Sequence, residues 1–467
     1  MMPCLALSLA TIIAAASPAP IPTPVTHVFT QSMAHDIDTI GDGIIHDGRS
    51  PGLAIGVVED GRVVYARGFG YANLAKHIPF EASTETYVGS ISKQFTAAGI
   101  LLLEQDGKLK LDDKVTKYVP DLTIAKDVTI RELLNQTSGL PDFQHAPGIN
   151  PDQTRSVKMS DLISAMNKMP LLSAPGTRYH YNDFNYMLAS TIIEQASSVP
   201  LSDYLEQHIF MPLVMNQSFY AGDLGISPTH AIGYTGTPEN FMSARTLDPA
   251  WLSGANGLVS NVYDIAKWDI DMPVLLRDNA VRDMFTSSGA SGPVQYGLGW
   301  TIDARDGKRY IWHNGDIPGY HAMNALLPDD HIAVIVLANA DDMGSPSVIQ
   351  PETVAARVLD IVTPPEETHL DNAIVQRARE WLQRLAEHRI DRTQLTPQFS
   401  DYLTDSLVSK SNLASLGKLQ TIVPISSMVG DNGSTVYEFL VRYPHEQYHY
   451  RLSVMKDGKI DGLVLVP

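Results

Sequence analysis

Residues 87–95 read YVGSISKQF, and this stretch decides the fold. It leads into an apolar run that continues to Leu103 and is followed by Gly107, a residue suited to the C-cap of a helix. Because the run is apolar on nearly every side, we expect a buried helix. Ser90 and Lys93 then lie on one face of its first turn, with Cβ atoms about 5–6 Å apart. A lysine amine at that distance can take the proton of a serine hydroxyl, so the stretch predicts a serine nucleophile beside a base.

The tetrapeptide S-x-x-K occurs by chance in many proteins, so its meaning depends on the rest of the chain. Strand patterns lie on both sides of it, at residues 51–58 and 62–71, joined by a turn at Glu59-Asp60-Gly61, and at 296–302, 308–313, 322–327 and 331–339. Helical patterns lie at residues 29–46, at 156–213 with Pro and Gly breaks, and at 262–271. These elements predict an α/β (α+β) fold in which the two ends of this region form one antiparallel sheet flanked by helices, with an all-α subdomain to one side.

Four segments are expected along the chain. Residues 1–24 carry no charged side chain and contain a mostly apolar segment that ends in small residues, as in a secretory signal. A main domain at 25–362 is followed by a Pro-rich, charged linker at 363–369 and by a small α+β domain at 370–467. The small domain is predicted from a helix around Trp381 and from strands at 435–443, 448–455 and 460–466. We therefore expect an exported protein, periplasmic or secreted, with two domains.

Composition excludes several function classes. The chain has 467 residues, of which 44% are hydrophobic, so it can bury a full core. A net charge of −18, without a long run of either sign, argues against a nucleic-acid partner. Cys4 is the single cysteine and lies in the signal segment, which excludes disulfides and cysteine-based sites from the mature chain. No segment reaches about 18 unbroken apolar residues, so we expect no transmembrane segment.

Two further stretches carry chemistry. Residues 175–183, PGTRYHYND, form a turn before the next helix and place Tyr181 in a loop, where side chains are exposed or functional. Residues 312–316, WHNGD, end a strand and contain Gly315, which lets a ligand approach the backbone closely. Taken singly, Tyr181 would be interpreted as a packed aromatic residue and His313 as a core histidine.

Taken together in this order, S-I-S-K at 90–93, Y-x-D at Tyr181 and H-N-G at His313 resemble the three motifs of the serine β-lactamase and penicillin-binding-protein superfamily. The similarity covers about residues 36–362 and points to the class C-like branch, which includes esterases and D-amino-acid peptidases. The resemblance implies an acyl-enzyme mechanism with no metal or organic cofactor. It makes Ser90 the nucleophile, Lys93 its partner and Tyr181 a general base or proton relay. It gives substrate-binding roles to Asp183, His313, Asn314, Gly315 and Asp316, and it places the oxyanion hole at the backbone N–H groups of Ser90 and Asp316.

Two positions differ from the class C β-lactamase pattern and bear on the substrate. His313 stands where that family has the lysine of K-T-G, and a histidine is mostly neutral above its usual pKa of about 6.5. A β-lactam carboxylate would lack its permanent cation, so esters and D-amino-acid peptides are preferred over β-lactams. Asp183 stands where the family has asparagine, and a carboxylate facing Lys93 is expected to raise the pKa of the lysine and keep it an ammonium. Tyr181, with a pKa lowered by Lys93, is then expected to be the base.

Two alternatives remain open. The chain could be a catalytically inactive penicillin-binding-like sensor or scaffold, although it retains all three motif positions. Residues 445–449, HEQYH, also match the zinc-protease motif H-E-x-x-H. That chemistry needs a helix, whereas the surrounding alternation indicates strands, on which His445 and His449 would be about 13 Å apart. We therefore expect no zinc site there.

Overall fold

The structure is a computed structural model of the chain. It describes residues 28–466 apart from 144–145, 151, 221–229, 239, 291–293, 307, 342–347, 365–367, 406–407, 409–412, 430–432 and 444–446. The expected signal segment therefore lies outside the described residues, as does part of the expected linker. Among the helices of the described ranges, none combines the length and the apolar character that crossing a membrane requires.

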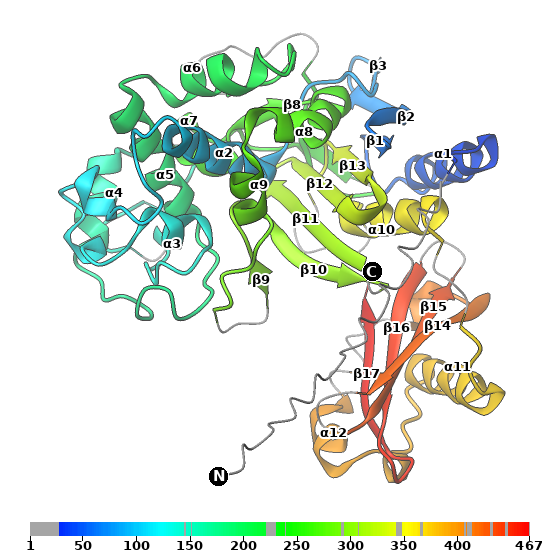
Figure 1. Cartoon of the computed structure of the whole chain (residues 1–467). Coiled ribbons are helices and arrows are strands. Elements are labelled where there is room, and N and C mark those ends of the chain that lie inside the picture. The colour runs from blue at the N-terminus through cyan, green and yellow to red at the C-terminus, as the bar shows by residue number, and fades with distance from the viewer. Residues whose placement is uncertain are drawn as a thin grey trace, which may run out of the picture.

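Within the described residues, an eight-stranded antiparallel sheet forms the middle of the molecule, in the order β3-β2-β1-β13-β12-β11-β10-β9 (Figure 1). Its strands are β1 Gly52–Glu59, β2 Arg62–Asn73, β3 Ile78–Pro79, β9 Gln295–Tyr296, β10 Thr301–Arg305, β11 Lys308–Ile317, β12 Tyr320–Leu327 and β13 Ile332–Ala338. β1 pairs with β13, so that Val57 lies opposite Val334 and the two ends of this region meet in one sheet. Asp60 and Gly61 close the first hairpin at positive φ. The sheet predicted from the sequence is confirmed.

Helices cover both faces of this sheet (Figure 1). On one face, α1 (Gln31–His46) and α10 (Pro351–Val362) pack in a hydrophobic cluster with Leu53 and Ile55 of β1. On the other face, α2 (Ser92–Gln105) and α8 (Val262–Leu275) share a cluster with Ala54 and Val58, and α9 (Asp278–Met284) lies beside them. Because strand residues alternate between the two faces, a strand covered on both sides needs a nearly continuous apolar sequence, and β1 has one.

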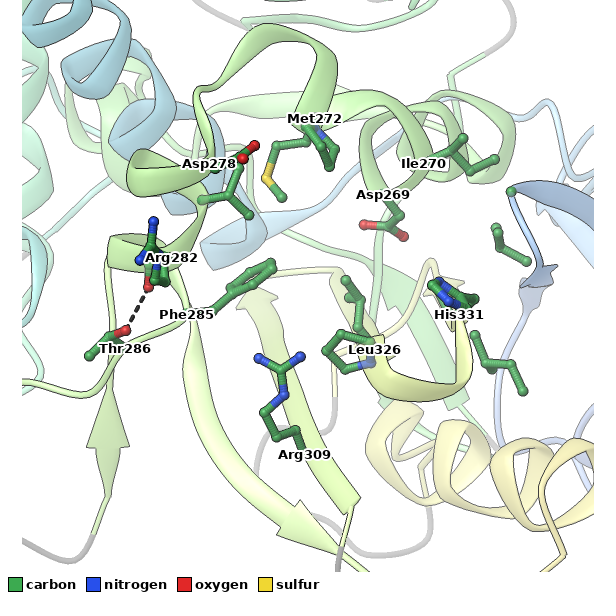
Figure 2. A pocket seen from close by; sticks show the side chains of 17 residues that line it. Asp269, Ile270, Met272, Asp278, Arg282, Phe285, Thr286, Arg309, Leu326 and His331 are labelled. Carbon is green, nitrogen blue, oxygen red and sulfur yellow. Dashed lines mark hydrogen bonds between the residues drawn. The ribbon is translucent and has the colours of Figure 1, made fainter. Parts of the chain in front are cut away.

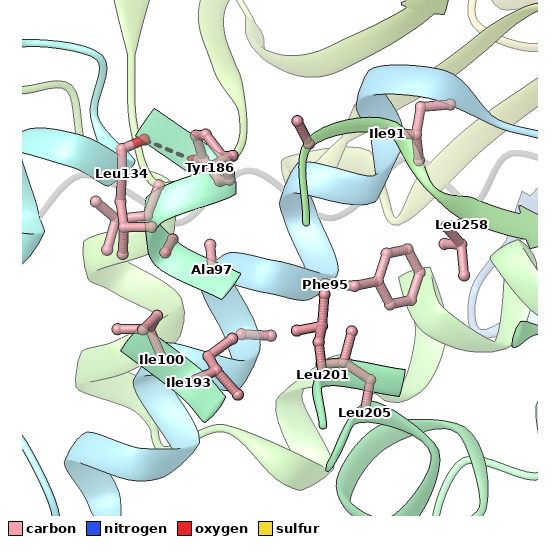
Figure 3. Close-up of a cluster of buried hydrophobic side chains, with 14 of the residues drawn as sticks. Ile91, Phe95, Ala97, Ile100, Leu134, Tyr186, Ile193, Leu201, Leu205 and Leu258 are labelled. Atoms are coloured by element: carbon pink, nitrogen blue, oxygen red, sulfur yellow. Dashed lines mark hydrogen bonds between the residues drawn. The ribbon is translucent and has the colours of Figure 1, made fainter. Parts of the chain in front are cut away.

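The helix α2 runs between the sheet and an all-α region. That region contains α3 Ile130–Leu134, α4 Met159–Met166, α5 Asp183–Ser197, α6 Leu201–Leu205, which continues as a π-turn at Glu206–Phe210, and α7 Pro249–Asn256. Short strands lie next to it: β4 Thr86–Tyr87, β5 Phe219–Tyr220 and β8 Leu258–Ser260 in one sheet, and β6 Tyr234–Thr237 with β7 Asn240–Ser243 in a hairpin. Figure 3 shows Phe95 and Ile100 of α2 among Ile193, Leu201 and Leu205. Lys93 is 0% exposed in this apolar surrounding, so its amine needs polar partners from neighbouring elements.

The C-terminal part has a hydrophobic cluster of its own, in which Trp381 packs with Phe439 and Tyr450. Its elements are α11 Asn372–Ala386, α12 Pro397–Tyr402 and the antiparallel strands β14 Thr421–Val429, β15 Thr435–Arg442, β16 Gln447–Val454 and β17 Ile460–Val466. The sequence predicts α11 and the last three strands, and it misses β14. Pro424 interrupts the pattern of β14, which is an edge strand whose register shifts next to this proline.

A cluster of charged groups joins the C-terminal part to the rest of the chain. Arg305, at the end of β10, lies 2.5 Å from a carboxylate oxygen of Asp360 on α10. His449 of β16 lies 3.7 Å from the same carboxylate and 3.5 Å from Glu438 of β15. His449 is thus on a strand, as the alternation predicts, whereas His445 of the H-E-x-x-H motif lies outside the described residues.

Candidate active site

Ser90 lies in a 3-10 turn, Gly89–Ile91, directly before α2. Gly89 has a φ of +52°, and a Cβ atom at this position would lie 2.8 Å from the backbone nitrogen of Asp316. A side chain there would displace β11, so the turn requires glycine. Ser90 itself is half-buried, and its hydroxyl faces the amine of Lys93 on the first turn of α2.

Three oxygen atoms surround the amine of Lys93. Its Nζ donates to Ser90 Oγ at 2.9 Å and to the carbonyl of Ala255 at 3.0 Å, and it lies 2.7 Å from Asp183 Oδ1. Complete burial lowers the pKa of Lys93, and the Asp183 carboxylate, which raises that pKa, offsets only part of the effect. The expected effect of Asp183 on the lysine pKa is therefore present, but the net pKa is lowered and not raised, because the sequence shows the carboxylate but not the desolvation. The arrangement of three acceptors still suits the three N–H groups of an ammonium.

Asp183 is the first residue of α5, next to the N-cap residue Asn182, whose side chain accepts the N–H of Phe184. Burial raises the pKa of Asp183, but contact with Lys93 and a hydrogen bond from Asn256 outweigh burial and lower it. The positive end of the helix dipole also favours a carboxylate at this position. Asp183 is therefore an anion that pairs with Lys93.

Asn256 is a site residue that the sequence analysis missed. Its Oδ1 accepts the hydroxyl proton of Ser90 at 2.9 Å, and its Nδ2 donates to Asp183 Oδ2 at 3.1 Å. The available signal was the glycine-rich segment GANG at 254–257. A Cβ atom on Gly254 would lie 2.8 Å from the carbonyl oxygen of Tyr186, so glycine allows this segment to approach the helices closely.

Tyr181 lies in the loop before α5, and the residue is 41% exposed. The ring centroid is 4.9 Å from Lys93 Nζ and 6.0 Å from the ring of His313. Desolvation and the charge of Asp183 raise the pKa of Tyr181 well above 10, whereas a hydrogen bond with Ser90 lowers it. The expectation of a phenol activated by Lys93 is therefore wrong, since the neighbouring Asp183 opposes ionisation and Tyr181 remains protonated.

His313 is 2% exposed, and both of its ring nitrogens are engaged. Nδ1 lies 2.5 Å from the carbonyl oxygen of Asn314, which can only accept, so Nδ1 carries the proton and Nε2 accepts from the hydroxyl of Tyr296 at 2.8 Å. Burial and the charge of Lys93 lower the pKa of His313 to about 3. His313 is thus an uncharged imidazole beside the site, and it cannot bind a substrate carboxylate as a cation.

The strand β11 brings its backbone against the turn that contains Ser90. A Cβ atom on Gly315 would lie 1.9 Å from the carbonyl oxygen of Val88 and 3.0 Å from the backbone nitrogen of Ser90. Together with the closeness of Gly89 to the nitrogen of Asp316, this contact places the backbone N–H groups of Ser90 and Asp316 next to one another. The arrangement suits an oxyanion hole.

The side chain of Asn314 points away from Ser90, which corrects the substrate-binding role expected for it. Its Nδ2 donates to Glu352 Oε1 on α10 at 2.7 Å. The sequence predicts that the strand ends at His313, whereas β11 continues to Ile317. Because successive strand residues alternate between faces, Asn314 lies on the face opposite His313 and Gly315.

A separate cavity of about 450 Å³ lies between α8, α9 and the β12–β13 hairpin (Figure 2). Met272, Phe285 and Leu326 form apolar parts of its wall, and Asp269 lies at its inner side. Burial raises the pKa of Asp269 to about 8, although a hydrogen bond from Asn324 lowers it. Ser90 does not line this cavity, so the candidate active site is identified by its chemistry and not by cavity size.

Among the described residues, Asp306, Glu438 and His449 bring metal-ligand atoms within 4.8 Å of one another. Arg451 contacts Glu438 at 3.0 Å, and Arg305 lies 3.9 Å from Asp306. Burial lowers the pKa of His449, but its carboxylate neighbours, Asp360 and Glu438, outweigh burial and raise it. These charges balance one another, so the group is better described as an ionic contact between the two parts of the chain.

Comparison with known proteins gives a family for the main part of the chain. Residues 25–358 match the protein family described as Beta-lactamase. The Staphylococcus aureus (strain MW2) protein named Protein flp is 25% identical over 333 residues, which cover 69% of this chain and 66% of the relative. The putative penicillin-binding protein PbpX of Bacillus subtilis (strain 168) is 30% identical over 287 residues, which cover 61% of this chain and 69% of the relative. The chain thus spans just under two thirds of the length of Protein flp.

Solved structures share the fold. A D-amino acid amidase from Ochrobactrum anthropi SV3 has a TM-score of 0.62 at 25% identity, covering 71% of this chain and 99% of that chain. EstCE1, a hydrolase with promiscuous acyltransferase activity, has a TM-score of 0.61 at 21% identity, covering 71% and 98%. The octameric penicillin-binding protein homologue from Pyrococcus abyssi has a TM-score of 0.62 at 22% identity and covers 90% of this chain and 97% of that chain.

Proposed function

Because the chain belongs to the beta-lactamase family, we propose that it is a serine hydrolase that cleaves an ester or amide through an acyl-enzyme at Ser90. The observation that carries the proposal is the hydrogen bond from Lys93 Nζ to Ser90 Oγ at 2.9 Å. A fully buried amine that is paired with Asp183 and directed at a half-exposed hydroxyl is arranged for chemistry rather than for packing.

In the proposed reaction, Ser90 Oγ forms a bond to the substrate carbonyl carbon while Tyr181 receives the hydroxyl proton. Because Tyr181 is a neutral phenol, it acts as a relay within this one step: its own proton passes to the leaving-group atom, whose bond to the carbonyl carbon breaks. Lys93, as an ammonium, stabilises negative charge that develops on Oγ. The N–H groups of Ser90 and Asp316 stabilise the oxyanion. A water molecule then attacks the acyl-enzyme, with its proton returned to Ser90 along the same path.

The charges of the site favour substrates that are neutral around the scissile bond. Lys93 is neutralised by Asp183, and His313 has a pKa of about 3, so neither offers a free cation to a carboxylate. Esters and amides of D-amino acids fit this site better than β-lactams, whose recognition in the family relies on a lysine at the position of His313. The names of the amidase and EstCE1 neighbours support amide and ester substrates. We further propose that residues 1–24 direct export.

A fluorophosphonate probe tests the proposed function. The wild-type protein should form a covalent adduct on Ser90, detected by mass spectrometry of the tryptic peptide, and Ser90→Ala should form none. Ser92→Ala is a matched control for probe specificity, because Ser92 is buried and its hydroxyl donates to the carbonyl of Gly89. A panel of p-nitrophenyl esters, D-alanyl amides and a chromogenic cephalosporin then ranks the substrates.

The alternative is an inactive sensor or scaffold with the same fold. Such a protein would bind ligands without an adduct, and Ser90→Ala would not change its behaviour. Absence of labelling in a folded wild-type protein would therefore overturn the proposed function.

A further inference from the structure

We infer that Glu352 is a positioning residue that holds the Asp316 segment of β11 against Ser90 from the opposite face of the sheet. This inference rests on the proposed function, because it assigns a purpose to the position of the proposed oxyanion hole. Glu352 does not touch the substrate side of the strand. It acts through Asn314 on β11 and His321 on β12.

One carboxylate oxygen of Glu352 connects the two strands. Oε1 accepts from Asn314 Nδ2 at 2.7 Å and lies 3.1 Å from His321 Nε2. Asn314 is two residues before Asp316 on β11, and His321 lies directly opposite Asp316 on β12. The carboxylate therefore links the side chains of two residues near the proposed oxyanion N–H of Asp316: Asn314 on the same strand and His321 on the neighbouring strand.

The helix α10 fixes the carboxylate in place. Glu352 is the second residue of α10, after Pro351, and the positive end of the helix favours its negative charge. Burial raises the pKa of Glu352, but the hydrogen bond and charge of His321 and the hydrogen bond from Asn314 outweigh burial and lower it. The carboxylate is therefore ionised at neutral pH, and hydrogen bonds to an ionised acceptor are about twice as strong as neutral ones.

The hydrogen bonds of Glu352 are concentrated on one atom. Among the described residues, its Oε2 is buried without a hydrogen-bond partner, so Oε1 makes both contacts. His321 is 4% exposed, so loss of the acceptor would leave a donor in a dry environment. β11 and β12 would then adjust to find new partners for their side chains.

Such an adjustment would act on Ser90, because the other face of β11 is packed directly against the turn that contains Ser90. The space for a Cβ atom on Gly315 is already occupied by the carbonyl oxygen of Val88, at 1.9 Å. A shift of the strand would therefore move the N–H of Asp316 relative to Ser90. Misplacement by about 1 Å can cost roughly 100-fold in rate. The loss should appear in the transition state, where the oxyanion forms, and not in binding of the neutral substrate.

The test compares Glu352→Leu, Glu352→Gln and the control Glu59→Gln in the full chain. Glu59 is a half-buried residue at the end of β1 that accepts the N–H of Phe29 at 3.0 Å, and it has no contact with the site residues described above. Glu352→Leu should lower the rate constant for fluorophosphonate labelling and kcat for the best ester about 10- to 100-fold, with KM changed less than about threefold. Glu352→Gln keeps an acceptor oxygen for Asn314 and should lose less than about tenfold. Glu59→Gln should match the wild type.

Asn314→Ala keeps the inference testable if Glu352→Leu does not fold. It should produce the same split between kcat and KM, and its effect should be less than additive with that of Glu352→Gln in the double variant, because both variants weaken the hydrogen bond between Asn314 and residue 352. The inference is overturned if folded Glu352 and Asn314 variants label and turn over like Glu59→Gln, or if only KM changes. A wild-type protein that is not labelled at Ser90 overturns the proposed function as well. Normal wild-type labelling with unaffected variants overturns the inference alone.

Discussion

Replacement of Asp183 by asparagine tests the charge pair on which the proposed chemistry depends. Lys93 is fully buried, and its Nζ lies 2.7 Å from Asp183 Oδ1. Removing one partner of a buried ion pair costs about 3–5 kcal/mol, because the other charge remains buried without compensation. The side chain of Asp183 is 30% exposed, and asparagine keeps an oxygen that can face Lys93. We therefore expect Asp183→Asn to destabilise the protein by a smaller amount, about 2–3 kcal/mol at pH 7.

The loss of folding stability in Asp183→Asn should depend on pH, and the pKa of Lys93 sets the direction of this dependence. Asp183 is the group that raises the pKa of Lys93 against burial, so the variant lowers that pKa further below the usual value of 10.5. A lysine with a depressed folded-state pKa binds fewer protons in the folded protein than in the unfolded chain, so stability rises with pH between the two pKa values. The pH range between the folded-state and unfolded-state pKa values of Lys93 is wider in the variant than in the wild type. The stability difference from the wild type should therefore be largest at pH 7 and should shrink towards pH 10.

Urea unfolding followed by tryptophan fluorescence at pH 7 and pH 9.5 measures this difference. Asp329→Asn is the control, because Asp329 pairs with Arg309 on the surface, where such pairs contribute about 0–1 kcal/mol. The basic limb of the kcat/KM profile should also move to lower pH in Asp183→Asn, since Lys93 acts as an ammonium. A loss that is equal at both pH values, together with an unchanged basic limb, would refute the coupling of Asp183 to Lys93.

Three further substitutions follow from the geometry. Asn256→Ala removes the acceptor of the Ser90 hydroxyl and should lower kcat about 10- to 100-fold in a folded protein, which an ester assay with circular dichroism as folding control can check. Gly315→Ala forces a Cβ atom to within 1.9 Å of the Val88 carbonyl oxygen and should cost about 1–3 kcal/mol and abolish labelling, whereas a fully labelled variant would contradict the packing. His449→Ala should destabilise the protein most below about pH 6.5 and progressively less above it, because a histidine with a raised folded-state pKa contributes stability that is lost as pH rises through that value. Unfolding curves at pH 6 and pH 8.5 test this, and a larger effect at pH 8.5 would contradict it.

Local geometry explains what the sequence predicts well. The three-residue spacing of Ser90 and Lys93 fixes their contact as soon as the segment is helical, whatever surrounds it. Alternation and the turn at Asp60-Gly61 likewise define the first hairpin. The resemblance to a known family assigns Tyr181 to the same site as Ser90 and Lys93, and the Tyr181 ring centroid lies 4.9 Å from Lys93 Nζ. Each of these inferences needs only neighbouring residues or a motif order.

The missed features depend on distant parts of the chain or on burial. Asn256 is 166 residues from Ser90, and the packing of α7 against α2 and the turn before it brings them together. The pKa of Lys93 depends on its desolvation, which the sequence does not reveal. The opposing carboxylate of Asp183, in contrast, can be seen in the sequence, because Asp183 stands where the family motif has asparagine. The orientation of Asn314 depends on where β11 ends. The sequence predicts an end at His313, four residues before the actual end at Ile317, so it does not show that Asn314 lies within the strand and follows the alternation of faces.

The balance of charges in the site determines what must stabilise the transition state. Lys93 and Asp183 neutralise one another, and His313 and Tyr181 are neutral, so these residues add no net charge to the site. Negative charge on the substrate oxygen must then be met by the backbone N–H groups of Ser90 and Asp316 and by the N-terminal end of α2. Backbone dipoles act only at short range and in fixed directions, whereas a mobile cation tolerates displacement. A site of this kind therefore depends strongly on the position of β11, which accounts for a charged group such as Glu352 on the far face of that strand.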